Sequence, residues 1–308
     1  MDELSAAAGD ELAFNRSFNG APGELVRLSP LVRRMVAGNP SPMTFTGTCT
    51  YVVGSGDVAV IDPGPADEAH RTALIDALRG EAVAAIVVTH THKDHSSGAR
   101  ALKRATGAPI FGCAPYAPAE QEGAAIRLDA AHDPAYAPDR ILREGDAFEA
   151  RDFALVCVET AGHTANHLAF SLPQEQALFS GDHVMAWSTS VIAPPDGSMR
   201  DYMDSLDKLR IREDKVFWPG HGGPVTEPRR FVRALAHHRR QRERAILSRL
   251  KEGDETVEAI VAQVYEGLAP ALRFPAGLSV LAHLQDLAQR GLVAADGPLT
   301  LSAHYRLA

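Results

Sequence analysis

One segment of the sequence concentrates side chains that bind divalent metal ions. The run Thr89-His90-Thr91-His92-Lys93-Asp94-His95 places three imidazoles and one carboxylate within six residues. Imidazole nitrogen and carboxylate oxygen are ligands that suit zinc and similar ions. The run directly follows Ala84-Ala85-Ile86-Val87-Val88, a short apolar stretch typical of a buried strand. A loop at the end of a rigid strand can direct alternate side chains inward, so the sequence predicts a metal site here.

Three further elements repeat this arrangement later in the chain. Each follows a predicted strand and delivers one potential ligand from a turn that contains glycine. The three elements are Ala161-Gly162-His163-Thr164, Ser180-Gly181-Asp182 and Trp218-Pro219-Gly220-His221-Gly222. A single histidine or aspartate after a glycine is more often structural than functional. Four such elements in this order favour one shared metal centre.

The surrounding elements predict an α/β sandwich. Strands alternate with helices early in the chain and run as neighbours later, which fits a sandwich better than a purely parallel sheet. The expected strands are 50–53, 58–61, 84–88, 109–111, 153–158, 168–172, 177–180 and 215–217, and the expected helices are 67–78 and 97–105.

The chain divides into three units. Residues 1–40 have few periodic apolar positions and predict a lead-in arm, residues 41–227 carry the ligands, and residues 228–308 are largely helical. In the last unit we expect a helix over 228–251, a second that opens at Glu255-Thr256 and a third over 278–290. A hairpin with strands at 291–293 and 299–301 follows, around the turn Asp296-Gly297. Helices followed by such a hairpin resemble a winged helix.

Composition narrows the class of protein. The 308 residues carry a net charge of −8, which argues against a uniformly basic nucleic-acid binder but leaves room for a local basic patch. Cys49, Cys113 and Cys157 are odd in number and scattered, so we expect reduced thiols near the core rather than a disulfide framework. The N-terminus is acidic where a signal peptide needs a basic start, and no apolar run approaches a membrane span. These features predict a cytoplasmic protein without a membrane partner.

From about Thr46 to Gly223 the chain resembles the metallo-β-lactamase-fold superfamily, on the HxHxDH segment and the three later ligands. The resemblance implies a four-layer αββα sandwich with two metal ions, most naturally zinc with iron or manganese as alternatives, at one edge of the facing sheets. It implies that one ion is bound by His90, His92 and His163, and the other by Asp94, His95 and His221, with Asp182 bridging both.

Such a centre implies a hydrolase. Two cations that share a water lower its pKa from ~15.7 toward ~7, so that hydroxide is available at neutral pH to attack carbon or phosphorus. Asp94 is the candidate catalytic residue: besides holding a metal, it can orient the nucleophile or take up its proton. A metal-bound water or Asp94 would protonate the leaving group.

Several neighbours of the ligands have two interpretations. Asp62 either accepts a hydrogen bond from a metal-bound histidine or forms a turn before Pro63. Asn166, His167 and His183 lie beside ligands in the sequence, and His167 is expected to face the core or a ligand. Lys93 points either to solvent or to an anionic substrate.

The C-terminal third indicates the branch of the superfamily. The chain resembles the lactamase-like branch with an appended winged helix in four segments, 201–206, 237–243, 256–257 and 279–284. Animal members of this endoribonuclease-like branch include a mitochondrial enzyme that acts on single-stranded RNA. Secreted β-lactamases usually have a cysteine where Asp182 stands, which disfavours antibiotic hydrolysis. Cys49 departs from the branch, whose members commonly have asparagine there, so the details of the substrate pocket stay open.

The arginines of segment 229–244 have two interpretations. They either track phosphates or form a solvated helix face with compensating acids. The residues are Arg229, Arg230, Arg233, Arg239, Arg240, Arg242 and Arg244. The C-terminal unit could instead cap the site or form a homodimer interface.

Three classes of function compete. The leading class is a dinuclear zinc hydrolase that cleaves a phosphodiester, thioester or lactone, with a small ester or single-stranded RNA as substrate. The second class is an iron-dependent oxidoreductase of the same fold, and within the hydrolases a thioesterase of glyoxalase II type is a further alternative. A nucleic-acid-binding module with a structural metal is the third class, and the absence of thiolates from the ligand set argues against it.

Overall fold

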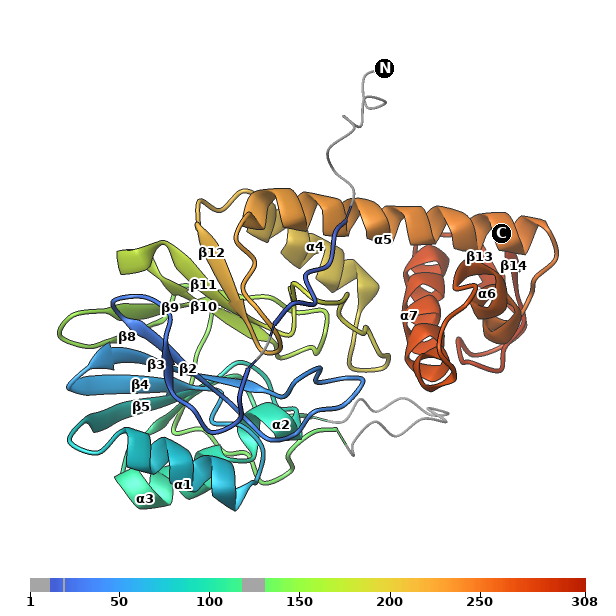
Figure 1. The fold of residues 1–308 in the computed structure, drawn as a ribbon. Helices are drawn as coiled ribbons and strands as arrows, with labels where there is room; N and C mark the ends of the chain where they lie inside the picture. Colours follow the sequence, from blue (N-terminus) through green and yellow to red (C-terminus); the bar gives the residue numbers. More distant parts are fainter. Residues whose placement is uncertain (1–11, 19, 118–130) are drawn as a thin grey trace.

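Two β-sheets face each other and helices cover their outer surfaces (Figure 1). The computed structural model describes residues 12–18, 20–117 and 131–308. The four-layer αββα order expected from the sequence is confirmed by this arrangement. Buried side chains of both sheets, among them Ile86, Phe170 and Phe179, fill the space between them. Burying one such side chain stabilises the fold by roughly 1.5–3 kcal/mol.

The first sheet changes from antiparallel to parallel pairing along its width. Its strands, in spatial order, are β1 (Val26–Arg27), β2 (Val32–Val36), β3 (Cys49–Ser55), β4 (Asp57–Ile61), β5 (Ala82–Val88), β6 (Ile110–Gly112) and β7 (Arg140–Ile141). Pairs up to β3–β4 are antiparallel, and β4–β5, β5–β6 and β6–β7 are parallel. Helices make two of the parallel crossovers, because a parallel neighbour requires the chain to return over the sheet face.

The second sheet brings three strand ends to one edge. Its order is β12 (Val216–Pro219), β11 (Ala177–Gly181), β10 (Leu168–Leu172), β9 (Ala154–Glu159) and β8 (Ala147–Glu149), with a 3-10 turn at Pro173–Glu175. Strand β11 is parallel to β12, and both β9 and β11 are antiparallel to β10. Strands β9, β11 and β12 therefore point the same way, and the loops that follow them emerge at the same edge.

The outer helices follow the amphipathic segments of the sequence. Helices α1 (Glu68–Ala77), α2 (Lys93–Ser96) and α3 (Ala99–Thr106) lie on the side of the first sheet, and α4 (Met199–Arg210) and α5 (Pro228–Lys251) cover the second (Figure 1). Asp67 begins α1 by accepting a hydrogen bond from the backbone N–H of Ala69, and Ser198 caps α4 through the N–H of Asp201.

The C-terminal unit has its own hydrophobic cluster. It contains α6 (Val257–Val264), α7 (Pro270–Gln289), β13 (Val293–Ala295) and β14 (Tyr305–Leu307). Helix α5 belongs to two cores, since Val232 and Leu235 pack against the second sheet while Ile246 and Leu250 pack in the C-terminal cluster. The long helix thus joins the two units instead of linking them through a flexible segment.

Three details differ from the sequence prediction. The arm predicted over 1–40 contains β1 and β2 of the first sheet, and Arg33-Arg34 had broken the apolar pattern there. Both arginines contact distant partners: Arg33 pairs with Glu81 at 2.7 Å, and Arg34 lies 4.3 Å from the ring centre of Phe18. Such partners are invisible to a local pattern.

The other two differences concern the C-terminal unit. The second hairpin strand is 305–307 rather than 299–301, because Leu299 and Leu301 pack against the C-terminal cluster instead of pairing with β13. The third helix begins at Pro270, eight residues before the expected start. A proline in the first turn of a helix needs no hydrogen-bond donor, so Pro270 does not oppose this start.

Within the described part of the chain, no helix combines the length and apolarity that crossing a bilayer requires.

Candidate metal centre

All seven ligands predicted from the sequence lie together at the edge where the strand ends meet. They form two groups, within each of which one ligand atom per residue lies within 4.8 Å of the others. One group is His90, His92, His163 and Asp182, and the other is Asp94, His95 and His221. The residues come from the loops after β5, β9, β11 and β12. The strand directions of the second sheet thus explain why residues far apart in sequence converge.

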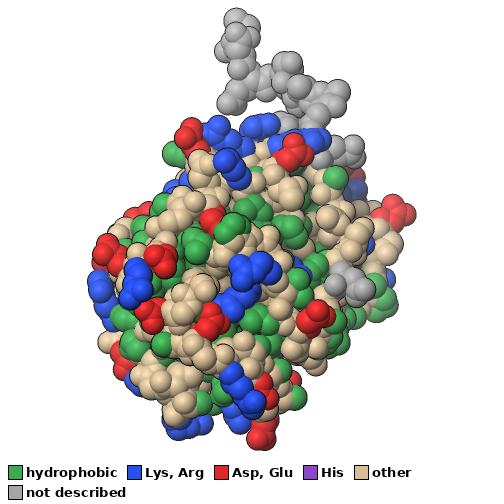
Figure 2. Space-filling view, turned by 60° about the vertical axis from the view of Figure 1, so that its left-hand side comes forward, with side chains coloured by type: hydrophobic (Ala, Val, Ile, Leu, Met, Phe, Trp, Pro, Cys, Tyr) green, Lys and Arg blue, Asp and Glu red, His purple; other side chains and the backbone are tan. Residues whose placement is uncertain are grey.

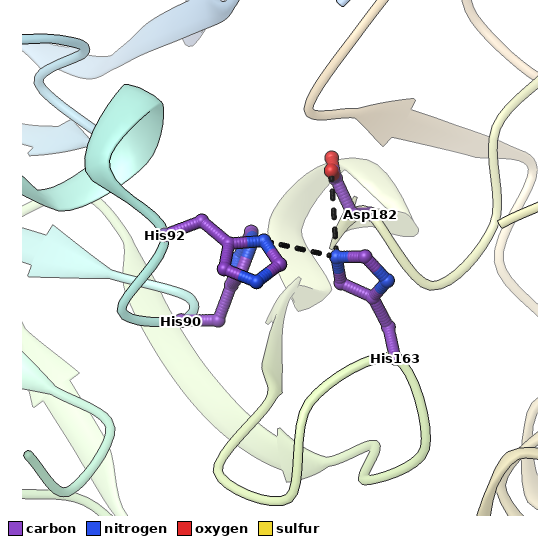
Figure 3. A group of neighbouring side chains, drawn as sticks. All are labelled: His90, His92, His163 and Asp182. Atoms are coloured by element: carbon purple, nitrogen blue, oxygen red, sulfur yellow. Dashed lines mark hydrogen bonds and ion pairs between the residues drawn. The ribbon is translucent and has the colours of Figure 1, made fainter. Parts of the chain in front are cut away.

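The first group has the spacing of ligands around a single ion. His92 Nδ1 lies 3.1 Å from His90 Nε2 and 3.2 Å from His163 Nε2. Figure 3 shows the rings turned toward one another, with Asp182 Oδ2 3.7 Å from His163 Nε2. A tetrahedral zinc ion with nitrogen ligands at ~2.0–2.1 Å separates those ligand atoms by about 3.3–3.4 Å. The observed distances fit that geometry.

The second group is joined to the first through Asp182. His95 Nε2 and His221 Nε2 lie 3.2 Å apart, and Asp94 Oδ2 lies 3.5 Å and 3.3 Å from them. Asp182 Oδ1 is 3.5 Å from His95 Nε2, and its Oδ2 is 3.3 Å from His221 Nε2. One carboxylate therefore faces both groups, as a bridging ligand must.

Outward contacts fix which ring nitrogen of each histidine faces the site. His163 Nδ1 lies 2.7 Å from the Val191 carbonyl, and His221 Nδ1 lies 3.3 Å from the Gly47 carbonyl. A carbonyl oxygen only accepts, so each Nδ1 carries a proton and each Nε2 presents a lone pair inward. Lone pairs that face one another at such distances repel unless a proton or a metal ion lies between them. The donor set fits a pair of divalent ions.

Asp62 supports the ligand loop through three hydrogen bonds. Its Oδ1 accepts from the backbone N–H of Thr89 at 2.8 Å, and its Oδ2 accepts from the Thr89 hydroxyl at 2.8 Å and from His95 Nδ1 at 2.9 Å. The Thr89 hydroxyl in turn lies 2.9 Å from His90 Nδ1. Since that hydroxyl donates to Asp62, it accepts from His90. One buried carboxylate thereby orients a histidine of each group.

The charges of the second group reinforce one another. Burial opposes ionisation of Asp182 and Asp94, but the imidazoles of His95 and His221 hold the pKa of both carboxyls well below the usual range. Burial also lowers the pKa of His221, and the two carboxylates outweigh it and raise that pKa to about 9. They raise the pKa of His95 in the same way. Without a metal, these histidines hold protons where an ion would otherwise sit.

Two histidines of the first group, His90 and His92, behave differently. Burial, reinforced by the neighbouring imidazoles, lowers the pKa of His90 and of His92 well below 6.5. Both rings are therefore neutral at pH 7, which is the state that binds a metal. The site combines neutral ligands on one side with a charged cluster on the other.

Glycines next to the ligands are required by close packing. A Cβ atom at Gly220 would lie 2.4 Å from Asp182 Oδ1 and 2.6 Å from His95 Cε1. A Cβ atom at Gly162, where φ is +137°, would lie 2.3 Å from the Cα of Tyr202. The glycine that precedes a ligand thus leaves room for the neighbouring ligand or helix.

Other residues singled out in the sequence lie around the centre. His167 is buried, with Nδ1 2.8 Å from Thr160 Oγ1, and its Nε2 accepts from the backbone N–H of Asp182. Asn166 Nδ2 donates to the Thr91 hydroxyl and the Ala114 carbonyl. Lys93 is exposed and belongs to neither group.

Sequence reasoning missed several contacts of the centre. The Thr48 hydroxyl donates to Asp94 Oδ2 at 3.2 Å. His132 packs against His92 with ring centroids 4.8 Å apart and stacks on Tyr116 at 3.7 Å. The Val191 and Gly47 carbonyls carry no signal in the sequence, because every residue has one. Thr48 lies two residues from a predicted strand and could have been noticed as a polar group near its start.

Three of the seven arginines of segment 229–244 lie beside an acidic side chain. Arg229 pairs with Glu213, Arg230 with Glu227, and Arg240 lies 3.9 Å from Asp207. Arg239 is buried instead of exposed. Over most of the face in Figure 2, basic and acidic side chains are interspersed, while basic side chains gather along its upper edge. The three ion pairs favour a solvated, compensated face over a phosphate track at Arg229, Arg230 and Arg240.

Comparison with known proteins agrees with this geometry. Residues 43–221 match the family model described as the metallo-beta-lactamase superfamily, and residues 256–298 match the beta-lactamase associated winged helix domain. The chain is 32% identical to a beta-lactamase-like protein 2 homolog of Caenorhabditis elegans, over 87% of each chain. It is 28% identical to an atrochrysone carboxyl ACP thioesterase of Aspergillus fumigatus, over 78% of this chain and 74% of that one.

Solved structures share the whole architecture. A metallo-beta-lactamase family protein from Thermus thermophilus superposes with a TM-score of 0.73 at 25% identity, covering 92% of this chain and 100% of that one. A beta-lactamase domain protein from Burkholderia ambifaria gives a TM-score of 0.79 at 22% identity, covering 95% and 96%, and shows the fold. The predicted winged helix is thus confirmed. The chain belongs to the metallo-beta-lactamase superfamily, as a hydrolase with a histidine and aspartate cluster able to hold metal ions.

Proposed function

We propose that the protein is a dinuclear zinc hydrolase that cleaves acyl thioesters. The observation that carries the proposal is the convergence of five imidazoles and two carboxylates in two adjoining groups. His90, His92 and His163 would hold one ion, Asp94, His95 and His221 the other, with Asp182 between them. Bound zinc would supply Lewis acidity and an activated water at neutral pH. Imidazole and carboxylate ligands without thiolates suit zinc in an open, catalytic site.

Asp94 is the residue of this set best suited to handle a proton. It is ionised at neutral pH, because His95 and His221 lower its pKa, and the Thr48 hydroxyl steadies its Oδ2. An ionised carboxylate can accept a proton from the attacking water but cannot serve as the initial acid. A thiolate needs less help from an acid to leave than the leaving group of a lactone or a phosphodiester of RNA, because thiols have pKa values near ~8.5. A thioester therefore fits a site in which Asp94 first accepts a proton.

Aromatic rings beside the second ligand group support an acyl substrate. Phe45 and Trp187 stack with centroids 4.8 Å apart and planes 10° apart. A Cβ atom at Gly222, which follows the ligand His221, would lie 2.8 Å from Trp187 Cδ1 and 3.5 Å from Phe45 Cδ1. Apolar and aromatic surface near a reactive centre favours an organic chain over a phosphate backbone. The relatives named acyl carrier protein thioesterases, at 28% identity, point the same way.

Single-stranded RNA is the second candidate substrate. The half-buried ring of Tyr116, which stacks on the buried His132 beside His92, is a ring on which a base can stack. The similarity to homologs of beta-lactamase-like protein 2, at 32% and 30% identity, is compatible with the lactamase-like branch that the sequence resembles. The ion-paired arginines of α5 weaken this candidate, because phosphate binding needs uncompensated basic charge.

A substrate panel tests the proposal. Elemental analysis of the purified protein should find two zinc ions per chain. The zinc-loaded protein is then compared on a medium-chain acyl thioester, a lactone, bis(p-nitrophenyl) phosphate and a single-stranded RNA oligonucleotide. We expect the highest kcat/KM for the thioester and loss of that activity in Asp182→Ala. Cleavage of RNA with no thioester hydrolysis would replace the first candidate with the second, and a protein that retains iron but no zinc would contradict the metal assignment.

A further inference from the structure

We propose that Arg239 of α5 is a positioning residue for the metal centre, through which the C-terminal helices hold the loop that carries contacts to His163 and Asp182. This inference rests on the proposed function, because it assumes that the seven residues bind metal. The inference assigns to the C-terminal helices the role of positioning the metal centre of the same chain. The loop in question, residues 183–192, follows the ligand Asp182 and is called the support loop below.

Arg239 is tied to the support loop although it belongs to a different unit. The side chain is 2% exposed, and its guanidinium donates a hydrogen bond to the Ser190 carbonyl. The guanidinium also lies 5.0 Å from the ring centre of Tyr202, whose hydroxyl donates to the His183 carbonyl at 3.0 Å. Arg239 therefore fixes the support loop near both of its ends, once directly and once through the ring of Tyr202.

The support loop passes this restraint to two ligands. The Ser190 hydroxyl lies 2.5 Å from the Asp182 carbonyl and 2.9 Å from the His183 carbonyl. The next residue, Val191, accepts the hydrogen bond from His163 Nδ1 that turns Nε2 toward the site. A displacement of the loop would change the orientation of His163 and the backbone position of Asp182. Both ligands belong to the first group.

Helix α7 holds the same loop from a second point. The Ser279 hydroxyl accepts a hydrogen bond from the Ile192 backbone N–H at 3.4 Å. Ser279 is buried and lies one turn before His283, which is also buried. Two helices of the C-terminal unit thus meet the support loop, so the loop is not held by the sandwich alone.

The surroundings of Arg239 indicate that packing alone does not explain a charged side chain at this buried position. No carboxylate pairs with Arg239 among the ion pairs of the described residues, and its Nε has no hydrogen-bond partner there. The nearby imidazoles are neutral, since burial and the Arg239 charge lower the pKa of His283 to about 3 and of His238 to about 4. A buried cation without a counter-charge is costly, and an apolar side chain would fill the space at lower cost. The charged side chain instead supplies a hydrogen bond to the Ser190 carbonyl and a cation–π contact with the Tyr202 ring.

The test measures metal affinity rather than activity. Arg239→Met keeps much of the side-chain length but removes the hydrogen bond and the charge. Zinc affinity is determined by competition with a chromophoric chelator, and circular dichroism checks that the variant is folded. We expect one of the two ions to bind about 10-fold more weakly, at the lower end of the effect of removing residues that orient ligands. Arg240→Met, the exposed neighbour on the same helix, should bind both ions as the wild type does.

Two more variants keep the inference falsifiable. Arg239→Lys retains a charge that can donate to the Ser190 carbonyl, so its affinity should lie nearer to the wild type than that of Arg239→Met. Ser279→Ala removes the separate tie from α7 and should weaken the same ion even if Arg239→Met fails to fold. Wild-type affinity in every folded variant of Arg239 and Ser279 would overturn the inference alone. A wild-type protein that binds no ion would overturn the proposed function as well.

Discussion

Replacing Asp62 with asparagine tests whether one buried carboxylate sets the protonation of a metal ligand. Asp62 has φ of 48°, a left-handed conformation that asparagine tolerates, so the backbone should be retained. The carboxylate accepts from the Thr89 backbone and hydroxyl and from His95 Nδ1. An amide has one oxygen and one NH₂ group, and it cannot accept at both positions.

Either orientation of the amide disturbs the site. With the NH₂ group toward His95, Nδ1 must accept a hydrogen bond, and the ring proton moves to Nε2, where it blocks coordination. With the NH₂ group toward the Thr89 backbone, two donors face each other, and an unsatisfied buried donor costs about 1–3 kcal/mol. Loss of such an orienting partner weakens metal binding by about 10- to 100-fold. At ~1.36 kcal/mol per decade, this corresponds to about 1.4–2.7 kcal/mol.

The assay is chelator competition at fixed pH, supported by the zinc content after dialysis. Asp57→Asn is the matched control, since Asp57 lies at the exposed end of the same strand β4. We expect Asp62→Asn to lose affinity chiefly for the ion near His95, while Asp57→Asn behaves as the wild type. Two ions bound by folded Asp62→Asn with unchanged affinity would refute the argument from the tautomer of His95.

Four further predictions concern the same centre. Gly220→Ala should abolish binding of at least one ion, because its Cβ would meet Asp182 Oδ1 at 2.4 Å, whereas Gly297→Ala, with no neighbour within 4 Å, should bind zinc normally in the same titration. Zinc uptake at pH 7 should release protons, since the carboxylates raise the pKa of His221 to about 9. The affinity for zinc should therefore rise with pH between about 6.5 and 9. Calorimetry in buffers of different ionisation enthalpy measures the proton release, and an affinity that does not depend on pH would contradict the prediction. The His221 contribution to the stability of the metal-free protein runs the other way: it is fully present below about 6.5 and is lost as the pH rises through about 9. His92→Ala and Asp182→Ala should each lower the zinc content measured by elemental analysis, and full activity with normal metal content would disprove their assignment.

The sequence alone indicated the candidate ligands and the class of fold. His90, His92, Asp94 and His95 are recognisable because coordination chemistry restricts which residue types can bind, and because a strand end confines them to a short loop. The strands that precede the candidate ligands were predictable from their apolar runs, since β5 and β11 are buried along most of their length. Glycines before His163, Asp182 and His221 marked the turns.

Tertiary structure alone decided which groups orient those ligands and how the C-terminal unit is attached. The Val191 and Gly47 carbonyls hold two histidines in place, yet their chemistry is common to every residue, so only the fold selects them. Arg34 and Arg239 are buried although they are charged, and the groups that contact them, the Phe18 ring and the Ser190 carbonyl, come from distant parts of the chain. Local sequence specifies what a side chain can bind. Which backbone groups and buried charges it meets depends on contacts between segments far apart in the chain, and these form only when the sheets and helices pack.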